Sequence, residues 1–500
     1  MMTADPRRPQ VVAAIDLGSN SFHMIVARLD EAGTLSIIDR LREPVRLGGG
    51  LNKKGRLSSE ARQRGLETLE RFAQRLSSLP RGSVRIVGTN TLRVASNSAK
   101  FVEEAERILG HPIEIIAGRE EARLIYLGVA HGRETREGNR LVVDIGGGST
   151  ELIIGEGLQS HFRESLLAGC VSSSRRFFGD GEIAKEQMRR AVMQARLAVY
   201  PVASRFWADN WDEAIGCSGT IKAIRNIAHA EGWSDSGVTR DSLYRLRDAM
   251  LAAGHIDRLQ LQTLEEDRRA VLPGGLAILL GVFETLDIER MRVSEQSLRE
   301  GLLYDLVGRI KHADVRASSV KSAASRWSVD QQQAQRVAVS ADRLFRHARK
   351  QWQLDDDARG LLSWAAHLHE IGLQVSHGQY QKHGAYILFN ADLPGFSRQE
   401  QALLATLVLN HRRKFRKATF ERLTERCRSP GMRLCLLLRL AVLLHRGRTE
   451  EQLPAVALDV SATQVRLQFP AGWLGDHPLT LCDLENEQRY LKKSGFALEF

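Results

Sequence analysis

Two segments of this chain repeat one short pattern of strand, glycine turn and strand. Residues 11–27 read VVAAIDLGSNSFHMIVA, and residues 141–155 read LVVDIGGGSTELIIG. They align at a constant offset of 128 positions, which pairs Asp16 with Asp144, Gly18 with Gly146, and Ser21 with Ser149. A period this long is typical of a duplicated domain, because each copy has room for its own sheet and helices. The repeat therefore predicts two similar α/β lobes that face each other.

Helical and strand patterns alternate through the first 300 residues. The segment 59–79 has the periodicity of a helix. The other expected elements are strands at 83–89 and 113–116, a helix near 185–200, a strand and turn at 214–220 that continues into a helix, and a helix pair over 273–308. This alternation predicts the α/β fold class.

The pattern changes after residue 315. Long helices are expected over 331–351 and 360–370, and strand alternation returns only in the last fifty residues. The sequence thus predicts four domains, which are a first lobe at 1–125, a second lobe at 126–307, a basic helical domain at 308–447 and a small α/β cap at 448–500.

The positive charge is concentrated in the helical region. The whole chain has a formal net charge of +11, and residues 308–447 alone contain 24 Lys and Arg against 11 Asp and Glu. A surface with this bias attracts an extended polyanion such as nucleic acid, an anionic membrane or a phosphate polymer. A solvated basic face is the alternative interpretation.

Cysteine spacing and hydropathy indicate a cytoplasmic protein. The five cysteines have no CxxC spacing, which argues against a disulfide framework or a zinc knuckle. The N-terminus reaches Asp16 after only five apolar residues, too few for a signal peptide. The most apolar later stretch, 432–444, contains two arginines and is shorter than the roughly 20 residues that span a bilayer. No transmembrane helix is expected.

The two glycine turns are suited to binding phosphate. Each begins with a carboxylate at the end of an apolar strand and continues with small residues whose backbone N–H groups can surround an anion. The residues expected to contact phosphate are Gly18, Ser19, Asn20 and Ser21 in the first turn, and Gly146, Gly147, Gly148, Ser149 and Thr150 in the second. Asp16 and Asp144 could hold Mg²⁺ through water. A single glycine turn is usually only a hairpin, and the repetition weakens that alternative.

Several longer segments resemble the exopolyphosphatase and guanosine pentaphosphate phosphohydrolase family, within the actin, hexokinase and heat-shock chaperone superfamily. They are DLGSNSFHMIVA at 16–27, GTNTLRVASN at 88–97, IIAGREEARLIYLGV at 115–129, DIGGGSTELIIG at 144–155 and GCSGTIKAI at 216–224. In the helical region, LHEIG and KHGAYILFNADLPGF are similar to the longer, four-domain exopolyphosphatases. The resemblance implies two duplicated actin-like (ribonuclease H-like) lobes, an all-α HD-like domain and a small C-terminal α/β cap.

The resemblance also implies roles for particular residues. Glu121, in GREEA, matches the catalytic base of the family, although an acidic residue at a helix N-terminus can simply complement the helix dipole. Asp144 and Glu151 match the carboxylates on the magnesium side, with Asp16 as a more distant, water-mediated ligand. Arg93 matches a contact to substrate phosphates. Mn²⁺ could replace Mg²⁺, and the family leaves room for a monovalent cation such as K⁺.

Three further features have two interpretations. The GCSGT turn either contacts a nucleotide or only braces the second lobe. Cys170 is expected to be a buried structural thiol rather than a nucleophile. His369 and Glu370, with His383 and His411, resemble an HD metal site, but no upstream histidine aligns, so this domain is expected to contribute basic surface without catalysis.

The sequence favours a processive exopolyphosphatase that releases terminal phosphate from inorganic polyphosphate through a water activated by Glu121. A guanosine pentaphosphate (pppGpp) 5′-phosphohydrolase that produces ppGpp and a catalytically silent polyphosphate-binding sensor are the alternatives. A sugar kinase fits less well, because the GREEA motif belongs to the phosphatase pattern. The resemblance implies a homodimer. We also expect no sequence-specific nucleic-acid binding and a cytoplasmic location, with room for peripheral contact with the inner membrane surface.

Overall fold

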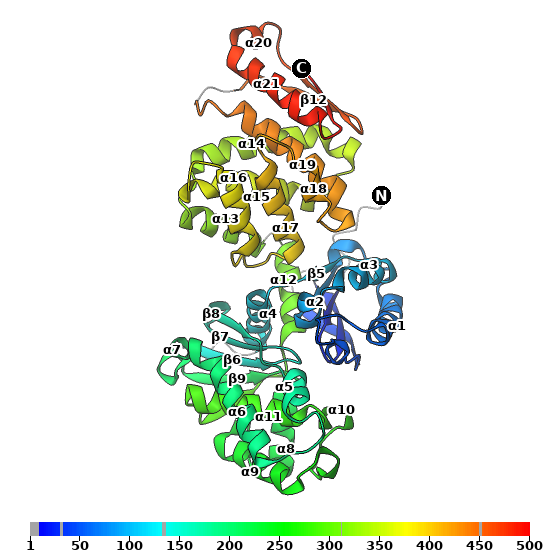
Figure 1. The fold of residues 1–500 in the computed structure, drawn as a ribbon, viewed down its shortest axis with the longest axis vertical. Helices are drawn as coiled ribbons and strands as arrows, with labels where there is room; N and C mark the ends of the chain where they lie inside the picture. The colour runs from blue at the N-terminus through cyan, green and yellow to red at the C-terminus, as the bar shows by residue number, and fades with distance from the viewer. Residues whose placement is uncertain (1–9, 31–33, 133–136, 312, 450–452) are drawn as a thin grey trace. The chain divides into compact units, whose positions relative to one another are not determined.

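The computed structural model describes residues 10–500, apart from 31–33, 133–136, 312 and 450–452. The chain divides into two compact units, residues 1–314 and 315–500 (Figure 1).

The first lobe is built on a five-stranded sheet in the order β3-β2-β1-β4-β5. Its strands are β1 (Gln10–Leu17), β2 (Phe22–Leu29), β3 (Leu35–Glu43), β4 (Val84–Gly88) and β5 (Ile113–Ile115). The first three are antiparallel neighbours, whereas β4 is parallel to both β1 and β5. Helices α1 (Ser59–Leu76) and α3 (Ser98–Leu109) pack on this sheet through apolar residues spaced three and four apart.

The second lobe repeats this strand order. Its strands are β6 (Arg140–Ile145), β7 (Thr150–Glu156), β8 (Gln159–Leu166), β9 (Glu213–Cys217), β10 (Val238–Thr239) and β11 (Arg290–Val293). The order β8-β7-β6-β9-β11 matches that of the first lobe, and β10 is added at the edge. Asp16 pairs with His23 across the β1–β2 hairpin, and Asp144 pairs with Glu151 at the same register of β6–β7. The predicted α/β fold with two duplicated actin-like lobes is therefore confirmed.

Two helices join the lobes. These are α4 (Gly118–His131) and α12 (Leu298–Ile310), and their apolar residues share one core with β1, β2, β6 and β7. The predicted boundaries at 125 and 307 fall inside these two helices rather than in loops. At their crossing Gly128 faces Gly301 so closely that a methyl group on Gly301 would overlap the carbonyl oxygen of Leu124.

This close approach leads to a stability prediction. A Gly301→Ala substitution is expected to lower the free energy of unfolding by about 1–3 kcal/mol, because the added methyl group overpacks two backbones. Thermal unfolding compared with Gly49→Ala measures the difference, because Gly49 is exposed, a Cβ there would meet no neighbour and its φ is not positive. Equal losses in the two variants would contradict the packing argument.

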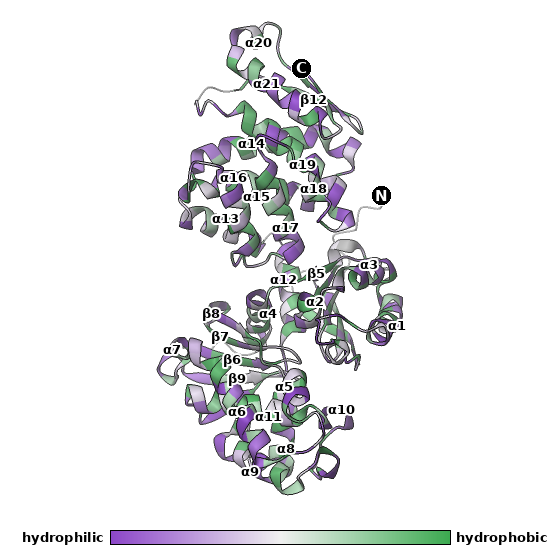
Figure 2. Ribbon diagram, viewed as in Figure 1, coloured by the Kyte–Doolittle hydropathy of each residue, from purple (hydrophilic) through white to green (hydrophobic). Residues whose placement is uncertain are grey.

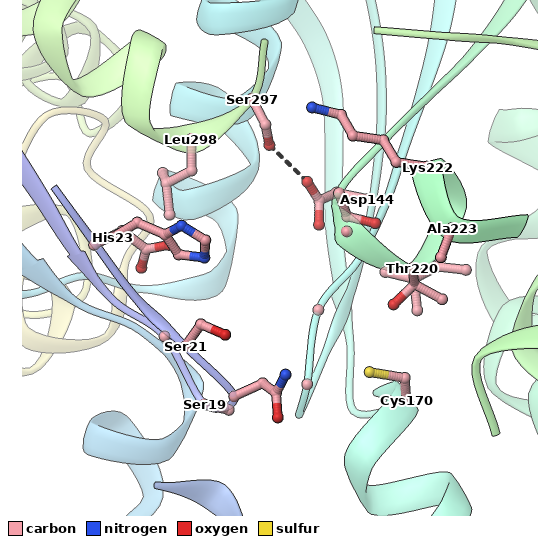
Figure 3. A pocket seen from close by; sticks show the side chains of 18 of the residues that line it. Ser19, Ser21, His23, Asp144, Cys170, Thr220, Lys222, Ala223, Ser297 and Leu298 are labelled. Carbon is pink, nitrogen blue, oxygen red and sulfur yellow. Dashed lines mark hydrogen bonds between the residues drawn. The ribbon is translucent and has the colours of Figure 1, made fainter. Parts of the chain in front are cut away.

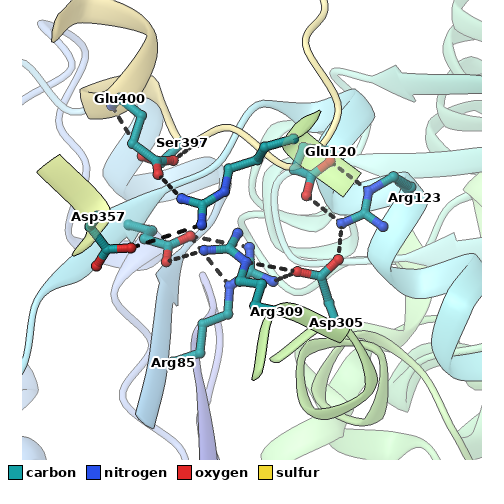
Figure 4. A network of polar contacts seen from close by, with 10 residues as sticks. Arg85, Glu120, Arg123, Asp305, Arg309, Asp357, Ser397 and Glu400 are labelled. Carbon is teal, nitrogen blue, oxygen red and sulfur yellow. Dashed lines mark hydrogen bonds and ion pairs between the residues drawn. The ribbon is translucent and has the colours of Figure 1, made fainter. Parts of the chain in front are cut away.

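A buried network of charges lies where α4 and α12 meet β4 (Figure 4). Asp305 of α12 accepts from Arg85 of β4 and, at 2.5 Å, from Arg123 of α4. Arg123 also donates to both carboxylate oxygens of Glu120 at 2.8 Å. The arginines around Asp305 hold the pKa of its carboxyl well below its usual range even though burial opposes this. The network fixes Glu120, and with it the first turn of α4.

The second unit is a helical bundle with a small sheet at its end. The main helices are α13 (Val315–Arg326), α14 (Gln331–Trp352), α15 (Asp356–Leu368), α16 (Tyr380–Asn390), α17 (Arg398–Asn410) and α19 (Glu425–Leu444). The sheet of β12 (Ala457–Val460), β13 (Gln464–Gln468) and β14 (Ala497–Glu499) shares one apolar core with this bundle, and so does helix α21 (Pro478–Lys492). Figure 2 shows green and purple residues intermixed along these helices, as expected when one face of each helix is buried. Within the described residues, no helix has the length and hydropathy of a membrane span.

Candidate active site

A cavity of about 370 Å³ lies between the two lobes of the first unit and is lined by both glycine turns. In Figure 3, Ser21 and His23 of the first lobe face Asp144 and Lys222 of the second lobe across this cavity. Most residues predicted to form the site line it, namely Asp16, Gly18, Ser19, Asn20, Ser21, Glu121, Asp144, Gly146, Gly147, Gly148 and Ser149. The fold thus brings together residues that are more than a hundred positions apart.

Backbone hydrogen bonds hold the two glycine turns in shape. In the first turn, the carbonyl oxygens of Ser19 and Asn20 accept from backbone N–H groups at 2.7 Å. In the second, Gly146 donates to Ser149 at 2.9 Å, and the carbonyl of Gly147 accepts from the start of α5 (Cys170–Phe177). A side chain on Gly148 would overlap Asn90 of the facing lobe. Small residues are therefore required here by the close approach of the lobes.

Four carboxyl groups converge beside this cavity; Glu121, Asp144 and Glu151 are buried, and Asp16 is half-buried. Asp16 comes from the end of β1, Glu121 from α4, Asp144 from β6 and Glu151 from β7. Burial is the main cause that raises the pKa of Asp16 to about 8, and the neighbouring Glu121 and Asp144 add to it. Burial also raises the pKa of the other three carboxyls, that of Glu151 well above its usual range. Such a cluster is stabilised by a nearby cation.

The hydrogen bonds of these carboxyls differ. Asp144 Oδ2 accepts from Ser297 Oγ at 2.7 Å and from Cys217 Sγ at 3.2 Å. Asp16 Oδ1 is buried and has no hydrogen-bond partner among the described residues. A buried oxygen without a partner indicates a group that a ligand or an ion completes.

Glu121 is held by Arg93. Arg93 Nη1 donates to Glu121 Oε2 at 3.2 Å and to the carbonyl oxygen of Ile116 at 2.8 Å. The same guanidinium lowers the pKa of Glu121 and so opposes the effect of burial. Arg93 is not among the residues that line the cavity, and its guanidinium contacts the Glu121 carboxylate.

Two other predicted residues also lie behind the cavity wall. Thr150 donates its hydroxyl to the carbonyl of Ala168 at 2.5 Å and is fully buried. Glu151 accepts from Ser165 Oγ at 2.8 Å and is likewise buried. Neither residue is among those that line the cavity.

The structure adds basic residues that the sequence did not single out. The cavity is also lined by His23, Arg42, Lys222, Arg225, Arg268 and Arg299. Lys222 and Arg225 lie on α8 (Gly219–Ala230), directly after the GCSGT turn, whose Ser218, Gly219 and Thr220 line the cavity too. The sequence could have indicated Lys222 and Arg225 as site residues, because both follow the GCSGT turn within one helix. Arg268 and Arg299 belong to segments without any motif, and only the fold brings them here.

Cys170 lies in the cavity wall but has a buried thiol. Its burial raises the pKa of this thiol, which opposes a nucleophilic role. His23, the counterpart of Glu151 in the repeat, is held neutral because burial and the nearby Arg299 lower its pKa.

The donor set beside the cavity determines which cation it could accept. Across the parts of the chain that the structure describes, no three His, Cys, Asp or Glu side chains are arranged to hold a metal ion directly. Mg²⁺ commonly keeps several waters and takes only one or two carboxylates together with substrate phosphates. Asp144 and the unpartnered oxygen of Asp16 fit this kind of site, whereas they do not fit a closed protein cage.

The duplicated lobes with a polar cavity between them define an actin-like fold class. Residues 25–310 match the Ppx/GppA phosphatase family, and residues 315–488 match domain III of the Ppx/GppA phosphatases. This chain belongs to the Ppx/GppA phosphatase family.

Individual relatives agree with this. The chain is 40% identical over 485 residues to the guanosine-5′-triphosphate,3′-diphosphate pyrophosphatase of Aeromonas hydrophila, with 97% of each chain covered. A solved Ppx/GppA family member from Aquifex aeolicus is 26% identical, covers 61% of this chain and 99% of its own, and has a TM-score of 0.50. An exopolyphosphatase from Cytophaga hutchinsonii, 24% identical, shares the fold with a TM-score of 0.55, over 60% of this chain and 98% of its own.

Proposed function

We propose that this protein is a guanosine pentaphosphate 5′-phosphohydrolase that converts pppGpp to ppGpp and phosphate. The observation that carries the proposal is the 40% identity, over nearly the whole of both chains, to a protein named for this nucleotide. This changes the order of the two activities expected from the sequence, because the similarity supports the nucleotide substrate better than polyphosphate. Both activities break a phosphoanhydride bond and would use the same cavity.

The residues of the cavity suit hydrolysis by direct attack of water. Glu121 would orient a water molecule and accept its proton as the oxygen attacks the terminal phosphorus. The bond from that phosphorus to the bridging oxygen breaks, and the oxygen stays on the shortened 5′-diphosphate. Arg93 would act as a positioning residue, because it fixes Glu121 and opposes the rise in the pKa of this carboxyl that burial causes. No covalent nucleophile is required.

The remaining groups would bind and neutralise phosphates. The backbone N–H groups of the two glycine turns surround the terminal phosphate, and Lys222, Arg268 and Arg299 face the other oxygens. We assign a Mg²⁺ site to Asp144 and Asp16, where Mn²⁺ could substitute and where the ion would neutralise charge on the phosphate oxygens. Glu151 would influence that site only indirectly, since it does not line the cavity.

Exopolyphosphatase activity is the second candidate. The observation that favours it is the excess of 24 basic over 11 acidic residues in 308–447, which suits a long phosphate polymer. A silent polyphosphate-binding sensor is disfavoured by the presence of Glu121, Asp144 and Glu151 beside one cavity. Homodimer formation, a monovalent cation and contact with a membrane surface stay predictions.

Phosphate release from pppGpp and from long-chain polyphosphate separates the two activities. Both substrates are supplied at equal concentrations of cleavable terminal phosphate. We expect kcat/KM for pppGpp to exceed that for polyphosphate by at least about tenfold. This is a modest difference for a site that discriminates between substrates by several contacts. Cleavage of polyphosphate alone would overturn the proposal. Cleavage of neither, with retained binding, would support the sensor.

A further inference from the structure

The second unit contains a cavity of its own, of about 590 Å³. It is lined by the residues that follow α15 and α17, by the C-terminal part of α19 and by α21. This volume falls within the range of pockets that bind small organic ligands. The proposed hydrolysis in the first unit does not involve this cavity.

Five arginines line this cavity, and two of them have no acidic partner among the described residues. Three are paired with carboxylates, namely Arg439 with Glu487, Arg446 with Asp483 and Arg448 with Glu370. Arg412 and Arg413 have no ion pair among the described residues, and the guanidinium of Arg412 lies 4.7 Å from the ring centroid of Tyr380. Arg413 also has a left-handed backbone with a φ of 58°, a conformation that is uncommon for a side chain of this size. Unpaired guanidinium groups beside a cavity suit phosphate oxygens.

Two buried acceptors lie among the residues that line the same cavity. His369 Nδ1 is 2.7 Å from the carbonyl oxygen of Ala366, which can only accept, so the proton of the neutral ring lies on Nδ1. His369 Nε2 therefore presents a lone pair, and it has no hydrogen-bond partner among the described residues. Glu370 accepts from Arg448 through Oε1, whereas its Oε2 also has no partner in the described part of the chain. The side chains are 1% and 6% exposed, so water does not readily satisfy them.

A metal ion does not explain these acceptors. His369 and His411 lie close together, with ring centroids 5.4 Å apart, but the described residues provide no set of three potential ligands. His383, the other histidine of the HD-like pattern, does not line the cavity. The surrounding arginines would also repel a cation. A ligand is needed that donates hydrogen bonds at one end and carries negative charge at the other.

We propose that this cavity binds a guanine nucleotide at a second site, separate from the cavity between the lobes. Guanine has two adjacent donors, N1–H and the 2-amino group, which can satisfy Glu370 Oε2 and His369 Nε2. The phosphates then lie against Arg412 and Arg413. Adenine offers a donor next to an acceptor on the corresponding edge, so it leaves one of the two buried acceptors unsatisfied. The inference concerns binding alone and holds whichever substrate the first unit hydrolyses.

Binding of GDP to the full chain tests the proposal. GDP lacks the terminal phosphate of the proposed substrate, and hydrogen–deuterium exchange reports where it binds. We expect protection of peptides covering 369–380 and 409–416, and at least about tenfold weaker binding of ADP and of pyrophosphate at the same peptides. Protection confined to the first unit, or pyrophosphate binding as tight as GDP, would overturn the proposal, the latter because it indicates a simple anion site.

Two variants separate the phosphate and base contacts. Arg412→Ala with Arg413→Ala should weaken GDP binding about tenfold or more, through lost charge-assisted hydrogen bonds, whereas the exposed Arg422→Ala should not. Glu370→Gln replaces an acceptor-only carboxylate by a carboxamide and should reduce the preference for GDP over ADP. An unchanged preference in Glu370→Gln would contradict the base assignment. Hydrolysis is not measured, so this result is independent of the proposed reaction.

Discussion

A Glu121→Gln variant is expected to release phosphate from pppGpp about 10²- to 10⁴-fold more slowly than the unchanged chain, the range over which a positioned general base contributes. Glutamine keeps the size of the side chain and can still accept from Arg93, but it cannot take up the proton of the attacking water. Because binding depends on the glycine turns and the basic residues, KM should change much less than kcat. Single-turnover phosphate release measures the chemical step directly.

The matched control is Glu103→Gln. Glu103 is an exposed glutamate of α3 whose ion pair among the described residues is with the exposed Arg107 of its own helix, so its loss should leave kcat unchanged. Both variants should unfold at the temperature of the unchanged chain. Turnover by Glu121→Gln within a few-fold of the control would remove Glu121 from the mechanism.

The largest effect on stability is expected from Asp305→Asn. Its carboxylate accepts from Arg85 and Arg123, and both arginines are nearly inaccessible to water. Removing one partner of a buried ion pair typically costs about 3–5 kcal/mol, because the remaining buried charge loses compensation, although here Arg123 keeps Glu120 and Arg85 keeps Glu114 as partners. The free energy of unfolding of the first unit should therefore fall by about this amount. Denaturant unfolding followed by a probe in that unit measures it, with the exposed Asp235→Asn as control.

The pH dependence of this loss has a definite sign. The folded-state pKa of Asp305 lies below its ordinary value of 3.8, so the unfolded chain binds the proton more readily. The stabilisation by Asp305 is therefore complete above that ordinary value and declines as the pH falls through the folded-state pKa. The difference between the unchanged chain and Asp305→Asn should stay constant from about pH 7 to about pH 5 and shrink below about pH 4. A difference that grows in acid would contradict this assignment.

Much of the first unit could be predicted because its signals are local. The glycine turns, the apolar strands beside them and the repeat at 128 positions all lie in short segments, and a duplicated strand order follows from a duplicated sequence. Strand β8 was not predicted, because its side chains are mostly exposed or half-buried and its sequence QSHFRESL lacks a clear apolar alternation. Its place in the sheet depends on pairing with β7.

Most of the predicted site residues line the cavity between the lobes, which is also lined by basic residues that the prediction omitted. The sequence identified Arg93 as a basic residue of the site, and the structure shows that it contacts Glu121 instead of lining the cavity. Arg268 and Arg299 were missed because neither lies in a motif. A long side chain can point to either side of its backbone, and no spacing rule decides which.

The sequence by itself determined that this protein has two related lobes, each with an acidic glycine turn, and a family whose chemistry is phosphate hydrolysis. The lobes and the family can both be predicted because the motifs that indicate them are short, local segments of the sequence. Only the tertiary structure decided which charged side chains lie close to one another. It placed four carboxyls beside basic side chains in the first unit, and in the second it left His369 Nε2 and Glu370 Oε2 without hydrogen-bond partners among the described residues. The physical reason is that desolvation and electrostatic coupling depend on distances across the fold, which residues far apart in the chain acquire only when it packs.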